Sequence, residues 1–214
     1  GGAINFISQR PNGSGVETKL TLGNYGLTQA QFTTDFEIAD GTYGKLVVNS
    51  KERDGYVHNA PGPYGGAQGV VPSADPTVNE LDTINSHGFR FTIARDTDNS
   101  SFDLSVDYND QSNTPPFAQL GYTIPNWSAA FGVGASPATG GLKLWPIELY
   151  TSKGRAKVAH VNEAVFEKSE VSGIALTYSR DTNLGTVKAI LARRDTEWSD
   201  NLDLDGGPFP IANT

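Results

Sequence analysis

The sequence predicts an all-β fold, and within that class the antiparallel strands of a transmembrane β-barrel. Three observations carry the prediction: apolar and polar residues alternate along several segments, the composition favours strands and turns, and short connections alternate with long ones. The 24 glycines and the many Thr, Asn and Asp residues disfavour helix interiors. We expect about seven strands from the period-two pattern.

The alternation is clearest in the segment "TQAQFTTDFEI", where Phe32 and Phe36 alternate with polar residues such as Gln31 and Asp35. A period of two places the two sets on opposite faces of a strand. The same pattern recurs in "SFDLSVDYND", "GFRFTIAR" and "GIALTYSR". The polar set is expected to face an aqueous lumen. The residues predicted to face lipid are Phe32, Phe36, Phe89, Phe91, Phe102, Leu104, Val106, Ile174 and Leu176.

The connections between the expected strands alternate in length. Short turns, "ADGTYG", "DTDNS" and "DTNLG", join three pairs of strands as hairpins, whereas long connections lie near 57–82 and 113–168. Connections beyond about 12–15 residues are uncommon in compact domains. Short turns at one end and long loops at the other are typical of outer-membrane barrels, so we expect these two loops to be extracellular. The short "GNYG" between the first two strands is an exception.

A water-soluble β-sandwich is the alternative interpretation. Strands with one apolar face are also the ordinary pattern of a secreted or surface binding module for carbohydrate or protein. The dense Asp, Asn, Gln and Thr residues on the second face of the strands favour the barrel.

Composition excludes several classes of function. A net charge of -8 argues against nucleic acid as a partner, because that affinity depends on Lys and Arg. The absence of cysteine removes disulfides and thiolate chemistry. His58, His87 and His160 lack the spacing of metal ligands. We find no catalytic constellation, and we expect no enzymatic activity, no cofactor and no metal.

Aromatic residues in the longest connection are the candidates for ligand contact. They lie in a segment without alternating polar partners, which fits a folded loop better than a strand. Aromatic rings in such a loop can stack on a flat or sugar-like ligand, or pack the loop against itself. The candidate residues are Trp127, Phe131, Trp145 and Tyr150.

The opening stretch "GGAINFISQRP" resembles the end of the plug domain of TonB-dependent outer-membrane receptors, where a Gly-Gly-x-Ile-Asn strand precedes a proline at the start of the barrel. "KERDGYVHN" resembles the Arg-Asp-Gly-Tyr segment at the top of the third barrel strand in that family. "GNYG" and "NLDLDGGPFPIANT" resemble two further family segments. The resemblance implies that residues 1–12 end a plug domain and that residues 13–214 form the first part of a barrel.

The resemblance also implies a function. Members of this family are plugged barrels of about 22 strands that take up scarce nutrients such as ferric siderophores across the Gram-negative outer membrane. The expected partners are therefore a small-molecule ligand, outer-membrane lipid, and the TonB complex through a region outside this chain. The chain is accordingly expected to be a fragment of a transporter.

Overall fold

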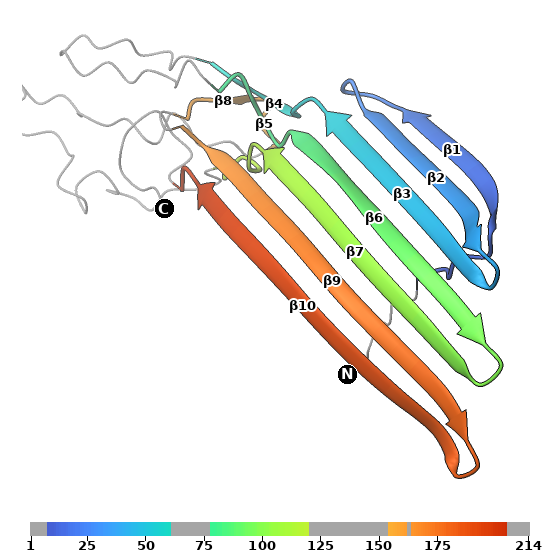
Figure 1. Ribbon diagram of the computed structural model, residues 1–214. Coiled ribbons are helices and arrows are strands. Elements are labelled where there is room, and N and C mark those ends of the chain that lie inside the picture. Colours follow the sequence, from blue (N-terminus) through green and yellow to red (C-terminus); the bar gives the residue numbers. More distant parts are fainter. Residues whose placement is uncertain (1–7, 61–77, 120–153, 162–163, 205–214) are drawn as a thin grey trace, which may run out of the picture. The chain divides into compact units, whose positions relative to one another are not determined.

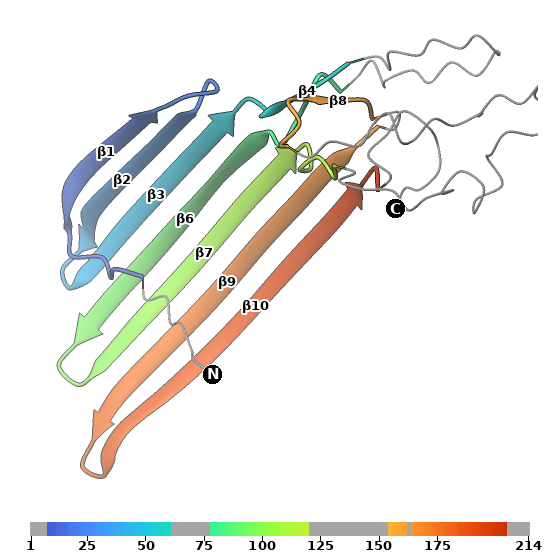
Figure 2. The same cartoon turned by 180° about the vertical axis from the view of Figure 1, so that it is seen from behind.

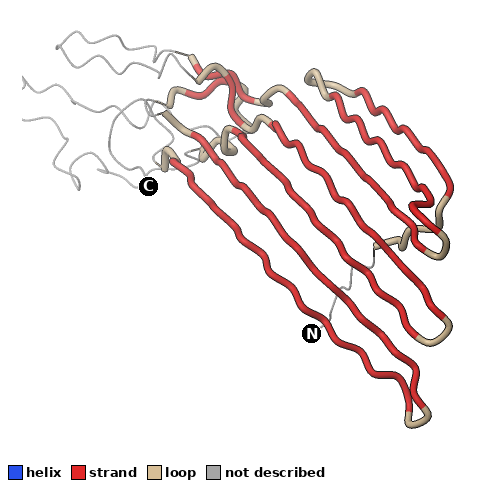
Figure 3. Tube along the Cα trace, in the orientation of Figure 1, coloured by secondary structure: helices blue, strands red, loops and turns tan. Residues whose placement is uncertain are grey.

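The computed structural model describes residues 8–60, 78–119, 154–161 and 164–204. These residues contain ten β-strands and no helix, which confirms the all-β prediction (Figures 1 and 3). No helix in the described part of the chain is long and apolar enough to cross a membrane. The strands belong to two compact units.

The first unit is built on a seven-stranded sheet of strand order β1-β2-β3-β6-β7-β9-β10, as the alternation predicted. Neighbouring strands run in opposite directions (Figure 1). The strands are β1 (Ser14–Leu22), β2 (Thr28–Ala39), β3 (Thr42–Arg53), β6 (Ile84–Thr97), β7 (Ser100–Asn113), β9 (Phe166–Thr182) and β10 (Gly185–Asn201).

Tight turns join four pairs of neighbouring strands, β1 with β2, β2 with β3, β6 with β7 and β9 with β10. Gly41, in the turn between β2 and β3, has a φ of 67°, a left-handed conformation that glycine adopts without strain. Between β1 and β2, the Gly23 N–H donates to the Leu27 carbonyl at 2.9 Å, and Tyr25 and Gly26 both have positive φ. The predicted short turns are thus confirmed.

The register of the strands separates two faces of the sheet. Phe91 pairs with Val106 and the adjacent Arg90 pairs with Asp107. Directly paired residues in an antiparallel sheet lie on the same face. The apolar face includes Phe32, Phe36, Val48, Phe89, Phe91, Phe102, Leu104, Val106, Ile174, Leu176 and Tyr178, and the polar face includes Asp35, Lys45, Arg90, Asp103, Ser105, Asp107 and Arg194.

Ring contacts between strands agree with this assignment. Phe36 on β2 stacks on Phe91 on β6 with ring centroids 6.5 Å apart. Phe102 on β7 contacts Tyr178 on β9 at 4.7 Å. The apolar face therefore continues from β2 to β9.

Burial on the sheet is the reverse of that in a water-soluble protein. On the apolar face, Phe32 is 40% exposed and Ile174 is 50% exposed. On the polar face, Asp35 is only 9% exposed, and Lys45 and Ser105 are 8% exposed. Several large apolar side chains of this sheet are thus exposed while polar side chains on its other face are buried.

The second unit contains a three-stranded sheet of β4 (Val57–Asn59), β5 (Glu80–Leu81) and β8 (Val158–Ala159). The central strand β4 pairs with β5 antiparallel and with β8 parallel. One side of this small sheet carries an apolar core, on which Tyr56 and Phe117 also pack. The core residues are Val57, Val78, Leu81, Ala159, Val161 and Val165.

The three short strands were not expected from the sequence, which placed uninterrupted loops near 57–82 and 113–168. Strands β4 and β5 lie in the first of these regions, β8 lies in the second, and β9 begins two residues before the second region ends. Strands of two or three residues are too short to produce a periodic signal. The partner of β4 in β8 is also remote in sequence, since His58 pairs with Val158.

Candidate functional site

The four aromatic residues predicted to contact a ligand, Trp127, Phe131, Trp145 and Tyr150, lie outside the described residues. The nine residues predicted to face lipid all lie on the apolar face. The register and the ring contacts Phe36–Phe91 and Phe102–Tyr178 place the residues of β2, β6 and β7 on the face of Tyr178, and the alternation along β9 adds Ile174 and Leu176. Their contact with lipid stays a prediction. Charged side chains are clustered on the polar face of the sheet and at the end of β3 in the second unit.

The leading segment (residues 8–13) crosses the polar face of the sheet (Figure 2). The backbone N–H groups of Asn12 and Gly13 donate to Asp35 Oδ1 at 2.9 and 3.2 Å. Lys45 Nζ donates to Gln9 Oε1 at 3.1 Å and pairs with Asp35 Oδ2 at 3.1 Å. The segment thus covers the ion pair between Asp35 on β2 and Lys45 on β3 and supplies hydrogen-bond partners to both side chains. Buried charges are costly unless they have such partners.

Arg10 holds the same segment to two further strands. Its Nη1 contacts Asp96 Oδ2 on β6 and its Nε contacts Asp103 Oδ1 on β7, both at 2.6 Å. The pKa of the Arg10 guanidinium is raised, and the largest cause is its hydrogen bond to Asp96. Partial burial lowers the pKa, whereas the hydrogen bond to Asp103 raises it further. Arg10 is therefore a fixed positive charge on the polar face.

A second charged cluster on the polar face joins three strands. Asp107 on β7 accepts from Arg194 Nη2 on β10 at 2.9 Å and from Arg90 Nη1 on β6 at 3.5 Å. Arg90 Nη2 also donates to Ser105 Oγ at 3.3 Å. We call Arg90, Asp107 and Arg194 the diarginine cluster.

Glycines allow side chains to meet across intervening strands. A Cβ at Gly88 on β6 would lie 2.8 Å from Asn109 Oδ1 and 2.9 Å from Asn49 Oδ1. A Cβ at Gly173 on β9 would lie 3.1 Å from both Asp107 Oδ2 and Arg194 Nη2. Polar groups of β3, β7 and β10 therefore lie directly over the backbones of β6 and β9.

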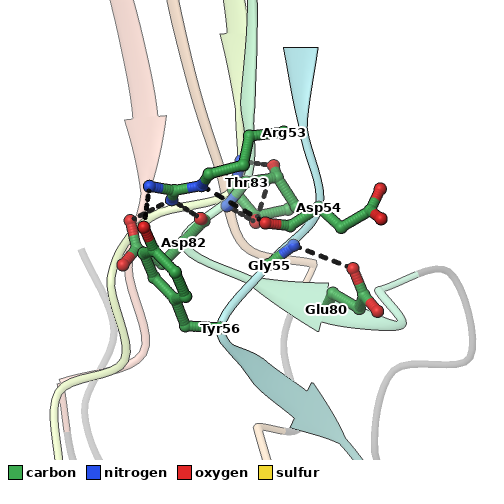
Figure 4. Close-up of polar contacts among 8 residues, drawn as sticks. Arg53, Asp54, Gly55, Tyr56, Glu80, Asp82 and Thr83 are labelled. Atoms are coloured by element: carbon green, nitrogen blue, oxygen red, sulfur yellow. Dashed lines mark hydrogen bonds and ion pairs between the residues drawn. The ribbon is translucent and has the colours of Figure 1, made fainter. Parts of the chain in front are cut away.

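In the second unit, Arg53 organises the end of β3 (Figure 4). Its guanidinium lies over the Tyr56 ring, 3.8 Å from the centroid, and Nη1 donates to the Tyr56 hydroxyl at 2.6 Å. Its Nη2 pairs with the Asp82 carboxylate at 3.2 Å and also contacts the Asp82 carbonyl. Arg53 thereby links the strand end to the residue that follows β5.

Gly55 fits between these groups because it lacks a side chain. Its N–H donates to Glu80 Oε2 at 2.8 Å, and a Cβ would lie 2.7 Å from Glu80 Cβ and would also collide with the Leu81 backbone. The Tyr56 N–H donates to the Leu81 carbonyl at 3.0 Å. The Arg-Asp-Gly-Tyr segment, singled out by its sequence, thus joins β4 to β5 and supports the core beneath them.

Parallel pairing brings two of the histidine-bearing segments together, which the sequence did not predict. His58 lies on β4, and His160 follows β8, where its Nδ1 is 2.8 Å from the Ala60 carbonyl oxygen. Among the described residues, no three His, Cys, Asp or Glu side chains are grouped so that they could hold a metal ion.

A shallow recess of about 370 Å³ on the apolar face was also not foreseen. Its lining includes Phe89, Tyr108 and Ile174 together with Arg193 and Asp195. Arg193 Nε contacts Asp195 Oδ2 at 3.0 Å, and both side chains are largely exposed. Arg193 and Arg194 thus occupy opposite faces of β10, as adjacent residues of a strand do.

Comparison with known proteins gives a likeness of fold. No family model matches the sequence, and no curated protein sequence matches it. The crystal structure of the ferric yersiniabactin uptake receptor FyuA from Yersinia pestis matches with a TM-score of 0.58 and 13% sequence identity. The match covers 91% of this chain and 25% of that receptor. At this identity the likeness concerns the fold alone, and the chain spans about a quarter of the length of that receptor.

Proposed function

We propose that this chain forms part of a TonB-dependent outer-membrane transporter that takes up a scarce nutrient such as a ferric siderophore. The observation that carries the proposal is the reversed burial of the seven-stranded sheet, with an exposed apolar face and a polar face crossed by the leading segment. Transmembrane barrels have this distribution, because their outer surface contacts lipid and their interior is polar.

The leading segment supports the plugged form of such a barrel. Gln9, Arg10 and Asn12 all contact the polar face, which is the inner face of the proposed barrel. A chain segment held there by ion pairs is what the end of a plug domain requires. In the proposal, residues 1–12 end the plug and residues 13–214 belong to the barrel.

The likeness in fold to FyuA supports a small iron-chelating molecule as the proposed ligand. FyuA is an uptake receptor for ferric yersiniabactin. By analogy, the ligand proposed here is a small iron-chelating molecule, contacted by Trp127, Phe131, Trp145 and Tyr150 in an extracellular loop. The TonB complex and outer-membrane lipid are the other proposed partners, and no catalytic step is proposed.

The alternative of a soluble β-sandwich has less support. A sandwich packs the apolar faces of two sheets against each other about 10 Å apart. In the described residues of the first unit, the large side chains of the apolar face, such as Phe32 and Phe89, remain about two-fifths exposed instead.

Spin labelling tests the membrane assignment, and the absence of cysteine in the chain makes single labels simple to introduce. Phe91→Cys on the apolar face and Thr92→Cys on the polar face are neighbours on β6. In the full-length protein in lipid vesicles, we expect the label at 91 to be more accessible to oxygen and the label at 92 to a water-soluble nickel chelate. Equal preference of both labels for the nickel chelate would contradict the proposal.

Loop shortening tests the proposed ligand site separately. Removing residues between Gln119 and Gly154, a range that contains the four aromatic candidates and spares β8 and Val161, should weaken binding of the natural substrate at the cell surface and leave the barrel assembled. Unchanged affinity in an assembled, heat-modifiable barrel would move the ligand site away from this loop.

A further inference from the structure

We propose that the diarginine cluster is an oxyanion-binding site on the polar face of the sheet. It would take the carboxylate or phosphate group of a small soluble molecule. The inference concerns residues of the first unit alone and does not depend on transport or on TonB coupling.

The charges of the cluster do not balance. Arg90 and Arg194 both contact Asp107, so two guanidinium groups share one carboxylate. One positive charge therefore remains in excess within the cluster. A single negative group would neutralise it, whereas the net charge of -8 on the whole chain disfavours a polyanion.

The hydrogen-bonding capacity of Arg90 is also incompletely used. A guanidinium carries five N–H donors. Among the described residues, Arg90 Nε is buried without a hydrogen-bond partner, and the bond from Nη1 to Asp107 is long at 3.5 Å. A buried donor without a partner costs free energy, so a ligand that let the Arg90 side chain shift into better contacts would be favoured.

Arg194 presents donors to solvent beside the same carboxylate. Its contact with Asp107 uses Nη2, and its side chain is 58% exposed. Gly173 keeps this place open, because a Cβ there would lie 3.1 Å from Arg194 Nη2. The planar guanidinium is suited to bidentate binding of carboxylate or phosphate.

Residue-resolved arginine labelling tests the proposal. The full-length protein, folded in detergent, would be treated with an arginine-selective dicarbonyl reagent, and the labelling rate of each arginine measured by mass spectrometry. Sodium phosphate and sodium acetate form two arms, each compared with sodium chloride at equal ionic strength. The anion that slows the labelling of Arg194 more strongly is the oxyanion that the site prefers.

Arg193 is a matched control, since it is adjacent in sequence, lies on the opposite face and pairs with Asp195. At an anion concentration of ten times Kd, we expect labelling of Arg194 to slow about tenfold, with Arg193 unchanged. Equal slowing of both arginines, or no slowing of Arg194 in either arm, would overturn the proposal.

Two variants separate binding from simple screening. Arg90→Gln removes one guanidinium and should abolish the protection of Arg194, whereas Arg193→Gln should leave that protection intact. Correct folding of each variant is checked by its circular dichroism spectrum and its thermal unfolding. Full protection of Arg194 in folded Arg90→Gln would contradict the two-arginine site, and the unaltered protein still decides the question if that variant does not fold.

Discussion

The two units of this chain bury opposite kinds of side chain. The second unit encloses Val57, Leu81, Val161 and their neighbours in an apolar core. The seven-stranded sheet instead buries Asp35, Lys45 and Ser105, while Phe32 and Ile174 on its other face are exposed. Both units come from one chain.

Composition alone therefore does not determine whether a β-sheet is surrounded by water or by lipid. The second unit is stabilised in water by the usual removal of apolar surface from solvent. The sheet leaves apolar surface exposed along several strands, a contiguous patch of the kind that marks a membrane or protein interface. The four substitutions that follow test this contrast.

Leu81→Ala is expected to have the largest effect, because Leu81 is only 1% exposed in the core of the second unit. Leucine-to-alanine changes in such cores destabilise by about 3–5 kcal/mol. Native-state hydrogen exchange at the Tyr56 and Asn59 amides, which bond to Leu81 and Asn79, measures the loss. Val158→Ala, at a side chain 46% exposed, is the control. Equal protection in both variants would show that no core exists there.

Phe32→Arg tests the apolar face. If this face contacts lipid, an arginine near the bilayer midplane costs about 2–4 kcal/mol. Thr33→Arg, the neighbour on the polar face of β2, should cost much less. Denaturant titrations of the full-length protein folded into vesicles compare the two. Equal costs would remove the distinction between the faces.

Lys45→Met tests the buried charges of the polar face. Removal of one partner from a buried ion pair costs about 3–5 kcal/mol. We expect roughly 2 kcal/mol here, below that range, because Asp35 keeps its two backbone donors from Asn12 and Gly13. The double variant Asp35→Asn with Lys45→Met should recover most of the loss in the same titration. An additive loss in the double variant would show that the two charges do not act as a pair.

Arg10→Gln is expected to have the smallest effect on stability, below about 1 kcal/mol, because its ion pairs are partly exposed. Its raised pKa means that the contribution is present throughout the neutral range and is lost only at strongly alkaline pH. Proteolysis before β1 should nevertheless accelerate, since the leading segment loses both contacts. Arg95→Gln, at an exposed side chain on the other face, is the control. Unchanged proteolysis would show that Arg10 does not hold the segment.

The sequence was sufficient to predict the long strands and their faces, because a period of two persists over many residues in β2 and β7. It was not sufficient for the β2–β3 register, which shifts between Glu37 and Ala39 through an irregularity that the pattern does not show. The small sheet escaped prediction because its strands are short and distant in sequence.

The charged sites were predicted only in part. Alternation placed Asp107 on a polar face, but its contact with Arg194 depends on a glycine of the intervening strand β9. The contact between Arg10 and Asp103 joins residues separated by 93 positions. Such contacts arise from tertiary packing and leave no local signal in the sequence.

The hydrogen bonds of Asn59 have a consequence for the length of the chain that follows it. Its N–H donates to the Asn79 carbonyl and its Nδ2 donates to the Val78 carbonyl, so both ends of the connection between β4 and β5 are held. The entropy of closing a connection grows slowly with its length, so that doubling it costs only about 0.6 kcal/mol. Insertions and deletions between Ala60 and Val78 are therefore expected to be thermodynamically mild. Evolution, or an engineer exchanging segments between related proteins, can vary this part of the chain while its base keeps the same pairing.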